Sequence, residues 1–199
     1  MIKCNDWAVL FDVDGTIVDN HNYHEQAWIE LGRRLNLPID QKYYRQYIHA
    51  RNNDEIVKKL FPNKKSKKFI QKIGDEKEVI YRELYRPFIK EIPGLTKLLK
   101  ALNTKNVPCA AVSNSPKENV DMVIDVLSIR NYFDVVLNCN DVSKAKPDPA
   151  IYLLAAKRLN IPIQKCIVFK DSFTGFKAAE ACGAPYIVIT AGMNKKDSK

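Results

Sequence analysis

The fold of this chain is limited first by an apolar run near the N-terminus that ends in two carboxylates, Trp7-Ala8-Val9-Leu10-Phe11-Asp12-Val13-Asp14-Gly15-Thr16. Five consecutive apolar residues have the length of a strand that is buried on both faces of a sheet. Gly15 ends this pattern, so both aspartates are expected at the carboxyl end of the strand, the edge where open α/β sheets bind ligands. Residues two apart in a strand point to the same side, so Asp12 and Asp14 should share one small site.

The second half of the chain alternates between apolar runs and helical patterns. Strands are predicted at residues 107–112, 133–137, 166–169 and 186–189, and helices at residues 95–104, 117–127, 149–159 and 174–182. Strands that alternate with helices are typical of a doubly wound parallel sheet. We therefore predict an α/β fold with a Rossmann-like sheet core.

The segment between the first strand and this alternating region has only helical patterns. A helix begins near Tyr23 and ends around Leu35–Pro38, and further helices are expected over residues 41–49, 53–61 (with Asn53 as N-cap) and 66–85. The candidate core positions of the last of these helices are Phe69, Ile73, Val79, Ile80 and Leu84. The predicted domains are thus an α/β core at residues 1–19 and 90–199, interrupted by an all-α insertion at residues 20–89.

Composition excludes several classes of protein. Apolar residues make up 46% and charged residues 28%, as in soluble globular proteins. The sequence has no signal-peptide pattern and no segment of transmembrane length, so a cytoplasmic protein without a membrane partner is expected, as a monomer or weak dimer. Its 5 cysteines include no Cys-x-x-Cys pair and favour reduced thiols over disulfides or a zinc site.

A net charge of +9 raises the question of an anionic partner. The densest basic run, Lys64-Lys65-Ser66-Lys67-Lys68, contains no aromatic residue and lies in no nucleic-acid-binding motif. A solvated surface is the preferred interpretation. We therefore expect no nucleic-acid partner and a small phosphorylated substrate instead.

Four polar clusters follow the predicted strands or precede a helix: Asp12 with Asp14, Ser113-Asn114-Ser115, Lys146, and Lys170-Asp171-Ser172. Taken singly, the serine cluster is equally compatible with a helix cap, and Asp171 is compatible with a cap of the next helix. A lone lysine such as Lys146 is more often an ordinary surface residue. Taken together, the clusters can converge on one edge of the sheet. They are then the parts that a phosphate site requires.

Each cluster has a chemical role in such a site. Asp12 can attack phosphorus, while Asp14 delivers a proton to the leaving oxygen and later takes one from water. Ser113 and Asn114, ahead of a helix, can bind phosphate oxygens. Lys146 supplies positive charge against the nucleophile and the transferring group.

Carboxylates at this edge also suggest a hard cation. Asp171 offers a hard oxygen ligand for Mg²⁺ beside Asp12, and Asp14 completes the predicted ligand set. Two carboxylates crowded at one strand end repel each other unless a cation or a division of protonation states relieves them. Mg²⁺ is therefore the predicted cofactor.

These motifs resemble those of the haloacid dehalogenase superfamily. The strings that carry the resemblance are Phe11-Asp-Val-Asp-Gly-Thr-Ile-Val-Asp19, the strand-end Ser113, Lys146-Pro-Asp-Pro149 and Asp171-Ser-x-x-Gly175. The helical insertion is similar to the α-helical cap of the β-phosphoglucomutase-like and phosphoglycolate phosphatase-like subgroup. The resemblance implies Mg²⁺, an aspartyl-phosphate intermediate, and water or a sugar hydroxyl as the final acceptor.

The insertion carries two further candidates for substrate binding. The string from Asp19 to Trp28, with Tyr23 and His24, resembles the hinge into the cap, which implies that His24 senses the substrate. The alternative for His24 is a packed or solvated helix residue. Arg51 can grip a substrate anion through its guanidinium fork, or it is an inert exposed arginine.

The sequence departs from the family pattern at two positions. In the family, the residue before the aspartate that matches Asp171 is commonly an acid, whereas here it is Lys170. This reversal of charge predicts weaker Mg²⁺ binding, unless Lys170 turns outward or contacts a phosphate. Pro116 stands where mutases place a lysine after the Ser-x-Ser string, with Lys117 one residue later. The second departure argues against a mutase.

The predicted function is a Mg²⁺-dependent phosphatase that hydrolyses a small phosphorylated metabolite, of sugar phosphate or phosphoglycolate type, through an aspartyl-phosphate. Two alternatives stay open. The first is a β-phosphoglucomutase-type phosphomutase. The second is a catalytically weakened protein that binds a phosphate ligand, for which Lys170 is the clue.

Overall fold

The computed structural model describes residues 6–49 and 51–190. The chain divides into two compact units, Met1–Asn20 with Ile89–Lys199 and His21–Phe88. The second unit differs by one residue at each end from the predicted helical insertion.

The first unit is built on a parallel sheet. Its described strands are β1 (Ala8–Asp12), β2 (Cys109–Val112), β3 (Val135–Leu137), β4 (Cys166–Lys170) and β5 (Tyr186–Val188), in the order β3-β2-β1-β4-β5. All four pairings are parallel. Because the chain moves outward from β1 to β3 and then returns to the other side of β1, the topological switch point lies between β1 and β4.

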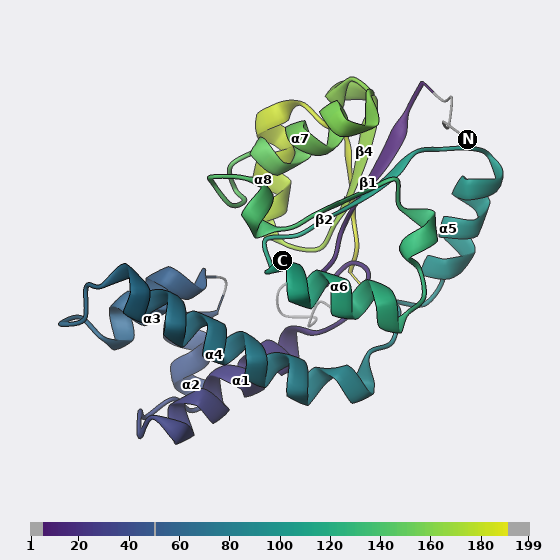
Figure 1. Cartoon of the computed structure of the whole chain (residues 1–199). Helices are drawn as coiled ribbons and strands as arrows, with labels where there is room; N and C mark the ends of the chain where they lie inside the picture. Colours follow the sequence, from purple (N-terminus) through teal and green to yellow (C-terminus); the bar gives the residue numbers. More distant parts are fainter. Residues whose placement is uncertain (1–5, 50, 191–199) are drawn as a thin grey trace. The chain divides into compact units, whose positions relative to one another are not determined.

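Helices cover both faces of this sheet, as Figure 1 shows. Helices α7 (Ala150–Leu159) and α8 (Phe173–Cys182) lie on one side of the strands, and α5 (Leu95–Thr104) and α6 (Lys117–Val126) lie on the other. Covering both faces leaves every residue of β1 and β2 buried. This explains why these strands consist of continuous apolar runs up to their last residues.

The secondary structure described in the second unit consists of helices joined by turns and loops. It comprises α1 (His21–Arg34), α2 (Gln41–Tyr43), the π-helix η1 (Tyr44–Ile48), α3 (Asn53–Leu60), α4 (Lys67–Tyr85) and the short 3₁₀ helix η2 (Arg86–Phe88). Helices α1 and α4 pack along each other, and α3 packs on α4. Apolar side chains of α1 and α4, including Trp28, Leu31, Ile80 and Tyr81, form its core.

Two local predictions in this unit are wrong, and a third differs in detail. The helix expected over residues 41–49 is present over residues 41–48, but it becomes a π-helix after Tyr43, with the amide of His49 bonded to the carbonyl of Tyr44 at 2.9 Å. The N-cap of α3 is Asn52, not Asn53, because the Asn52 carboxamide oxygen accepts from the Glu55 amide at 2.9 Å. Val79 is 43% exposed, since it lies about 100° around the helix from the buried Ile80.

Several predicted boundaries in the first unit also shift. The strands expected at 107–112, 133–137 and 186–189 begin or end one or two residues inside those ranges, and β4 extends one residue further, to Lys170. The predicted helix from Pro149 begins at Ala150, with Pro149 as its N-cap. In the described part of the chain, the cysteines at 109, 139, 166 and 182 are free thiols, whereas Cys4 lies outside it.

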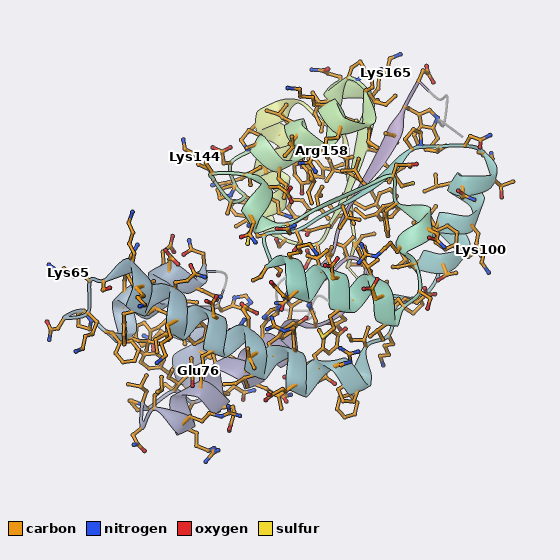
Figure 2. The ribbon with its side chains drawn as sticks, in the orientation of Figure 1. Lys65, Glu76, Lys100, Lys144, Arg158 and Lys165 are labelled. Carbon is orange, nitrogen blue, oxygen red and sulfur yellow. The ribbon has the colours of Figure 1, made fainter. Side chains whose placement is uncertain are left out.

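The surface accounts for most of the basic charge. Figure 2 shows the side chains of Lys65, Lys100, Lys144 and Lys165 projecting outward from the ribbon. The basic run at residues 64–68 is exposed throughout, as expected of a solvated segment. None of the described helices is both long and apolar enough to span a membrane.

Candidate active site

Asp12 lies at the end of β1 and contacts two lysine ammonium groups. Its Oδ2 atom is 2.9 Å from the Nζ atom of Lys146 and also accepts a hydrogen bond from the Nζ atom of Lys170. Its Oδ1 atom accepts from the backbone amide of Val13 at 2.8 Å. All three charged side chains are almost fully buried, with 3–4% of their surface exposed.

Asp14 is held by neutral hydrogen-bond donors. The hydroxyls of Ser113 and Ser115 donate to its Oδ2 atom at 2.9 and 2.8 Å, and the Asn20 carboxamide donates to its Oδ1 atom at 2.5 Å. The turn that places Asp14 here requires Gly15, whose φ of 74° lies in the left-handed region that favours glycine. Asp12 and Asp14 therefore differ in environment, one between charges and the other among hydroxyl and amide groups.

The main chain of Lys146 is fixed by Asn114. The Asn114 carboxamide donates to the Lys146 carbonyl at 3.2 Å and accepts from the Lys146 amide at 3.0 Å. The Nζ atom of Lys146 also lies 3.5 Å from the Val112 carbonyl at the end of β2. This two-point contact ties the segment before α7 to the end of β2, so Asn114 positions the Lys146 ammonium at Asp12.

Lys170, the last residue of β4, points into the site. Besides Asp12, its Nζ atom contacts Asp171 Oδ1 at 3.2 Å, so one ammonium group joins the two carboxylates. The side chain runs across Gly175 in the first turn of α8, where an added Cβ would lie 2.7 Å from Lys170 Cγ and closer still to Cδ and Cε. Glycine at position 175 therefore leaves the space that the lysine chain occupies.

The two lysines differ in their electrostatic balance. Burial lowers the pKa of Lys146 below its ordinary value, and the nearby Lys170 charge lowers it further, while Asp12 opposes both effects. Burial also acts to lower the pKa of Lys170, but Asp12 and Asp171 together outweigh it and raise that pKa. Lys170 is thus the ammonium more firmly held in its charged form.

The structure brings together most of the residues that the sequence singled out at the strand ends. Direct contacts link Asp12 to Lys146 and Asp14 to Ser113, and Lys170 joins Asp12 to Asp171. The predicted contact of Asn114 with phosphate stays a prediction, since its carboxamide is used on Lys146. His24 and the exposed Arg51 belong to the helical unit, and their roles also stay predictions.

Sequence reasoning missed one residue of the site, Asn20, and did not predict the direction of another, Lys170. Asn20 is fully buried and bonded to Asp14, although it follows the family string as an apparently ordinary polar residue. Lys170 was noted as a departure, but its inward direction was not predicted. The direction of Lys170 depends on the register of β1 and β4, in which Phe11 pairs with Phe169, and no sequence signal indicates that register.

The carboxylates of this site do not fit a metal ion as they are placed. Asp12 and Asp171, two of the predicted ligands, both contact the Lys170 ammonium, and both oxygens of the third, Asp14, accept hydrogen bonds. Among residues 6–49 and 51–190, no group of three or more His, Cys, Asp or Glu side chains is arranged to hold a metal. An ammonium group stands where a shared metal ion would have to contact both carboxylates.

The fold and the site together define a doubly wound α/β protein with a pair of carboxylates at the end of its first strand. Comparison with known families makes the assignment specific: a model of the haloacid dehalogenase-like hydrolase family matches residues 8–183. The chain therefore belongs to the haloacid dehalogenase-like hydrolase family.

Individual relatives agree with this assignment. The chain is 30% identical over 179 residues to a phosphorylated carbohydrates phosphatase of Thermotoga maritima. The aligned region covers 88% of this chain and 81% of that protein. It is 26% identical over 194 residues to β-phosphoglucomutase of Bacillus subtilis, covering 94% and 84%. A crystal structure of a family IA, variant 3 hydrolase from Entamoeba histolytica superposes with a TM-score of 0.87 at 30% identity, covering 96% and 87%.

These findings confirm three predictions made from the sequence: the superfamily, the parallel α/β fold, and an enzyme of the phosphoric monoester hydrolase class. They leave the residue roles, the metal and the substrate as predictions.

Proposed function

We propose that this chain is a phosphatase that hydrolyses a small phosphorylated carbohydrate or related metabolite through an aspartyl-phosphate on Asp12. The observation that carries the proposal is the pairing of two unlike carboxylates at the end of β1, Asp12 against two ammonium groups and Asp14 against hydroxyl and amide donors. Membership of a hydrolase family and similarity to a protein named as a phosphatase of phosphorylated carbohydrates support it.

In the first step, a carboxylate oxygen of Asp12 attacks phosphorus and the bond from phosphorus to the substrate oxygen breaks. The departing oxygen takes a proton from the carboxyl group of Asp14. Lys146 and Lys170 lie at Asp12, so they can stabilise the negative charge on the transferring group.

In the second step, water attacks the phosphorus atom of the aspartyl-phosphate and gives a proton to the Asp14 carboxylate. The bond from phosphorus to Asp12 breaks, inorganic phosphate leaves, and Asp14 is again protonated for the next cycle. The hydrogen bonds from Ser113, Ser115 and Asn20 hold Asp14 in one orientation for both transfers.

Other parts of the proposal rest on the sequence and on the resemblance. Residues 20–89 would act as a helical cap over the substrate, with His24 and Arg51 as its contacts, in a cytoplasmic monomer or weak dimer. Mg²⁺, held by Asp12, Asp14 and Asp171, is the cofactor that the resemblance predicts. Since these carboxylates are already engaged by the chain's own donors, no step above passes through a metal.

A panel of sugar phosphates and phosphoglycolate, assayed for phosphate release with and without Mg²⁺, tests the function. Replacing Asp12 by Asn removes the nucleophile and should reduce turnover by about a thousandfold or more. Asp6→Asn is the matched control, because Asp6 is an exposed carboxylate of the same unit, paired with Lys165 at 3.4 Å. Equal turnover in the wild type and Asp12→Asn would refute the proposal.

The same panel separates the two alternatives. Isomerisation of a sugar phosphate that requires a bisphosphate primer would identify a mutase, which the similarity to β-phosphoglucomutase keeps open and Pro116 disfavours. Tight binding of a phosphate ligand without turnover would identify a binding protein, the alternative for which the contact of Lys170 with Asp12 is the specific observation.

A further inference from the structure

Compared with an acid at the same position, Lys170 makes the charge of the site more positive by two units, the charge of one divalent ion. The carboxylates of Asp12, Asp14 and Asp171 together with the ammonium groups of Lys146 and Lys170 give a formal charge of −1, from three negative and two positive groups. With an acid at position 170 the same site would have four carboxylates and one ammonium, a charge of −3. The difference of two units equals the charge of one divalent cation.

The position of the ammonium agrees with this count. Lys170 Nζ contacts Asp12 Oδ2 and lies 3.2 Å from Asp171 Oδ1, so it joins the two carboxylates that a metal ion would have to share. Its side chain is 4% exposed, which leaves it little room to turn outward to solvent. An isolated buried ammonium is costly, but this one contacts two buried carboxylates.

The chain around Lys170 is shaped to hold it there. Lys170 is the last residue of β4, so its backbone is fixed next to β1. Its carbonyl accepts a hydrogen bond from the amide of Ile189 at 2.8 Å. Gly175 supplies the gap through which the side chain passes. Strand register and a missing Cβ therefore combine to direct the ammonium at Asp12.

We propose that the Lys170 ammonium replaces a divalent metal ion in this site, joining Asp12 to Asp171 and binding the substrate phosphoryl group together with Lys146. The proposal deepens the proposed function and rests on it for turnover. It predicts that the site binds phosphate without a divalent metal, and that any turnover under the proposed function also needs no divalent metal.

Phosphate binding tests this directly, with inorganic phosphate as the probe and calorimetry as the readout, in EDTA and in Mg²⁺. The wild type should bind phosphate with the same Kd in both buffers. Lys170→Met removes one ammonium contact and should weaken binding in EDTA by about tenfold or more. Lys100→Met, an exposed lysine of α5 that Figure 2 shows projecting outward, makes the same chemical change away from the site and should bind normally.

A charge reversal gives the complementary result. Lys170→Glu restores the acid and should bind phosphate only when Mg²⁺ is added, with Mg²⁺ binding that calorimetry detects in this variant and not in the wild type. The comparison of the wild type in the two buffers needs no variant, so it remains informative if a substitution impairs folding. Phosphate binding by the wild type that depends on Mg²⁺ would overturn the proposal, as would normal binding by Lys170→Met in EDTA.

Turnover distinguishes this proposal from the proposed function. Phosphate release in EDTA that is lost in Asp12→Asn supports both. Release that occurs only with Mg²⁺ refutes the role of Lys170 and leaves the phosphatase assignment intact. Metal-independent phosphate binding with no turnover in either buffer supports the role of Lys170 and refutes the phosphatase.

Discussion

Each unit of this protein buries a lysine against a carboxylate, but the two clusters differ in balance. In the helical unit, Lys77 Nζ lies 3.0 Å from the neighbouring Glu78 and 2.7 Å from His24 Nδ1, with side-chain exposures of 3% and 7% for the ion pair. One positive charge faces one negative charge, and Asn53 donates to Glu78 at 2.7 Å. In the α/β unit, two ammonium groups and three carboxylates come together from the end of β1, the end of β4 and the segment before α7.

The origin of the charges explains this difference. Lys77 and Glu78 are adjacent on α4, and His24, which stacks on Tyr81 with ring centroids 4.0 Å apart, comes from the packed helix α1. The packing of helices α1 and α4 therefore brings His24 to the ion pair and buries it. The charges around Asp12 come from the ends of β1 and β4 and the segment before α7, where strands stop and side chains collect at one edge. Lys77 and Glu78 compensate each other's charge inside the helical unit, whereas the charged groups around Asp12 gather at the edge where an open α/β sheet binds ligands.

The largest expected effect would come from breaking the balanced cluster. Glu78→Leu leaves the buried Lys77 without its ion partner and should destabilise the helical unit by about 3–5 kcal/mol. Lys77→Met combined with Glu78→Leu removes both charges and should restore most of that loss. Urea unfolding followed by the fluorescence of Trp28, in a Trp7→Phe background, reports on this unit, because the chain has 2 tryptophans. A double variant as unstable as the single one would show that Lys77 and Glu78 do not act as a pair.

An intermediate effect is expected at Gly175, which gives room to Lys170. Gly175→Ala places a methyl group 2.7 Å or less from the lysine side chain and should cost about 1–3 kcal/mol while weakening phosphate binding. Gly74→Ala in α4 is the control, because its Cβ would meet Asn53 Cβ at an ordinary 3.5 Å and should stabilise the helix by about 0.5–1 kcal/mol. Urea unfolding and phosphate calorimetry measure both variants. Normal phosphate binding by Gly175→Ala would contradict the path assigned to the lysine chain.

The two clusters also differ in how much of each could be predicted from the sequence. Continuous apolar runs identified the strands. The ends of parallel strands place the backbones of Asp12, Ser113 and Asp171 at one edge of the sheet, in whichever direction their side chains point. That is why the α/β fold could be predicted. The direction of Lys170 could not, because it depends on the register between β1 and β4 and on space left by Gly175 five residues away.

The helices could also be predicted only in part: their locations, but not their caps or their hydrogen-bonding type. Apolar spacing located the helices of residues 21–88, but it could not separate Asn52 from Asn53 as the N-cap or detect the π-helix after Tyr43. Both depend on single hydrogen bonds that neighbouring residues could equally make. The ion pair of Lys77 and Glu78 was likewise hidden, because two adjacent charges on a helix usually face solvent.

The smallest effect is expected from an exposed ion pair, which separates the contribution of burial from that of charge. On α1, Arg33 and Arg34 donate to Glu30 at 2.8 and 2.9 Å, and these hydrogen bonds lower the pKa of Glu30 from 4.5 to about 2. Because the pKa is lowered on folding, the stabilisation is present above pH 4.5 and is lost as the pH falls towards 2. Glu30→Gln should therefore lower the Tm slightly at neutral pH and have progressively less effect on acidification.

Salt then distinguishes the exposed pair from the buried one. At 1 M salt the Debye length is about 3 Å, so the difference in Tm between the wild type and Glu30→Gln should nearly vanish, whereas the loss caused by Glu78→Leu should persist. Thermal unfolding at low and high salt measures both. If Glu30→Gln destabilised the protein as much as Glu78→Leu and resisted salt equally, burial would not be what makes the ion pair on α4 strong.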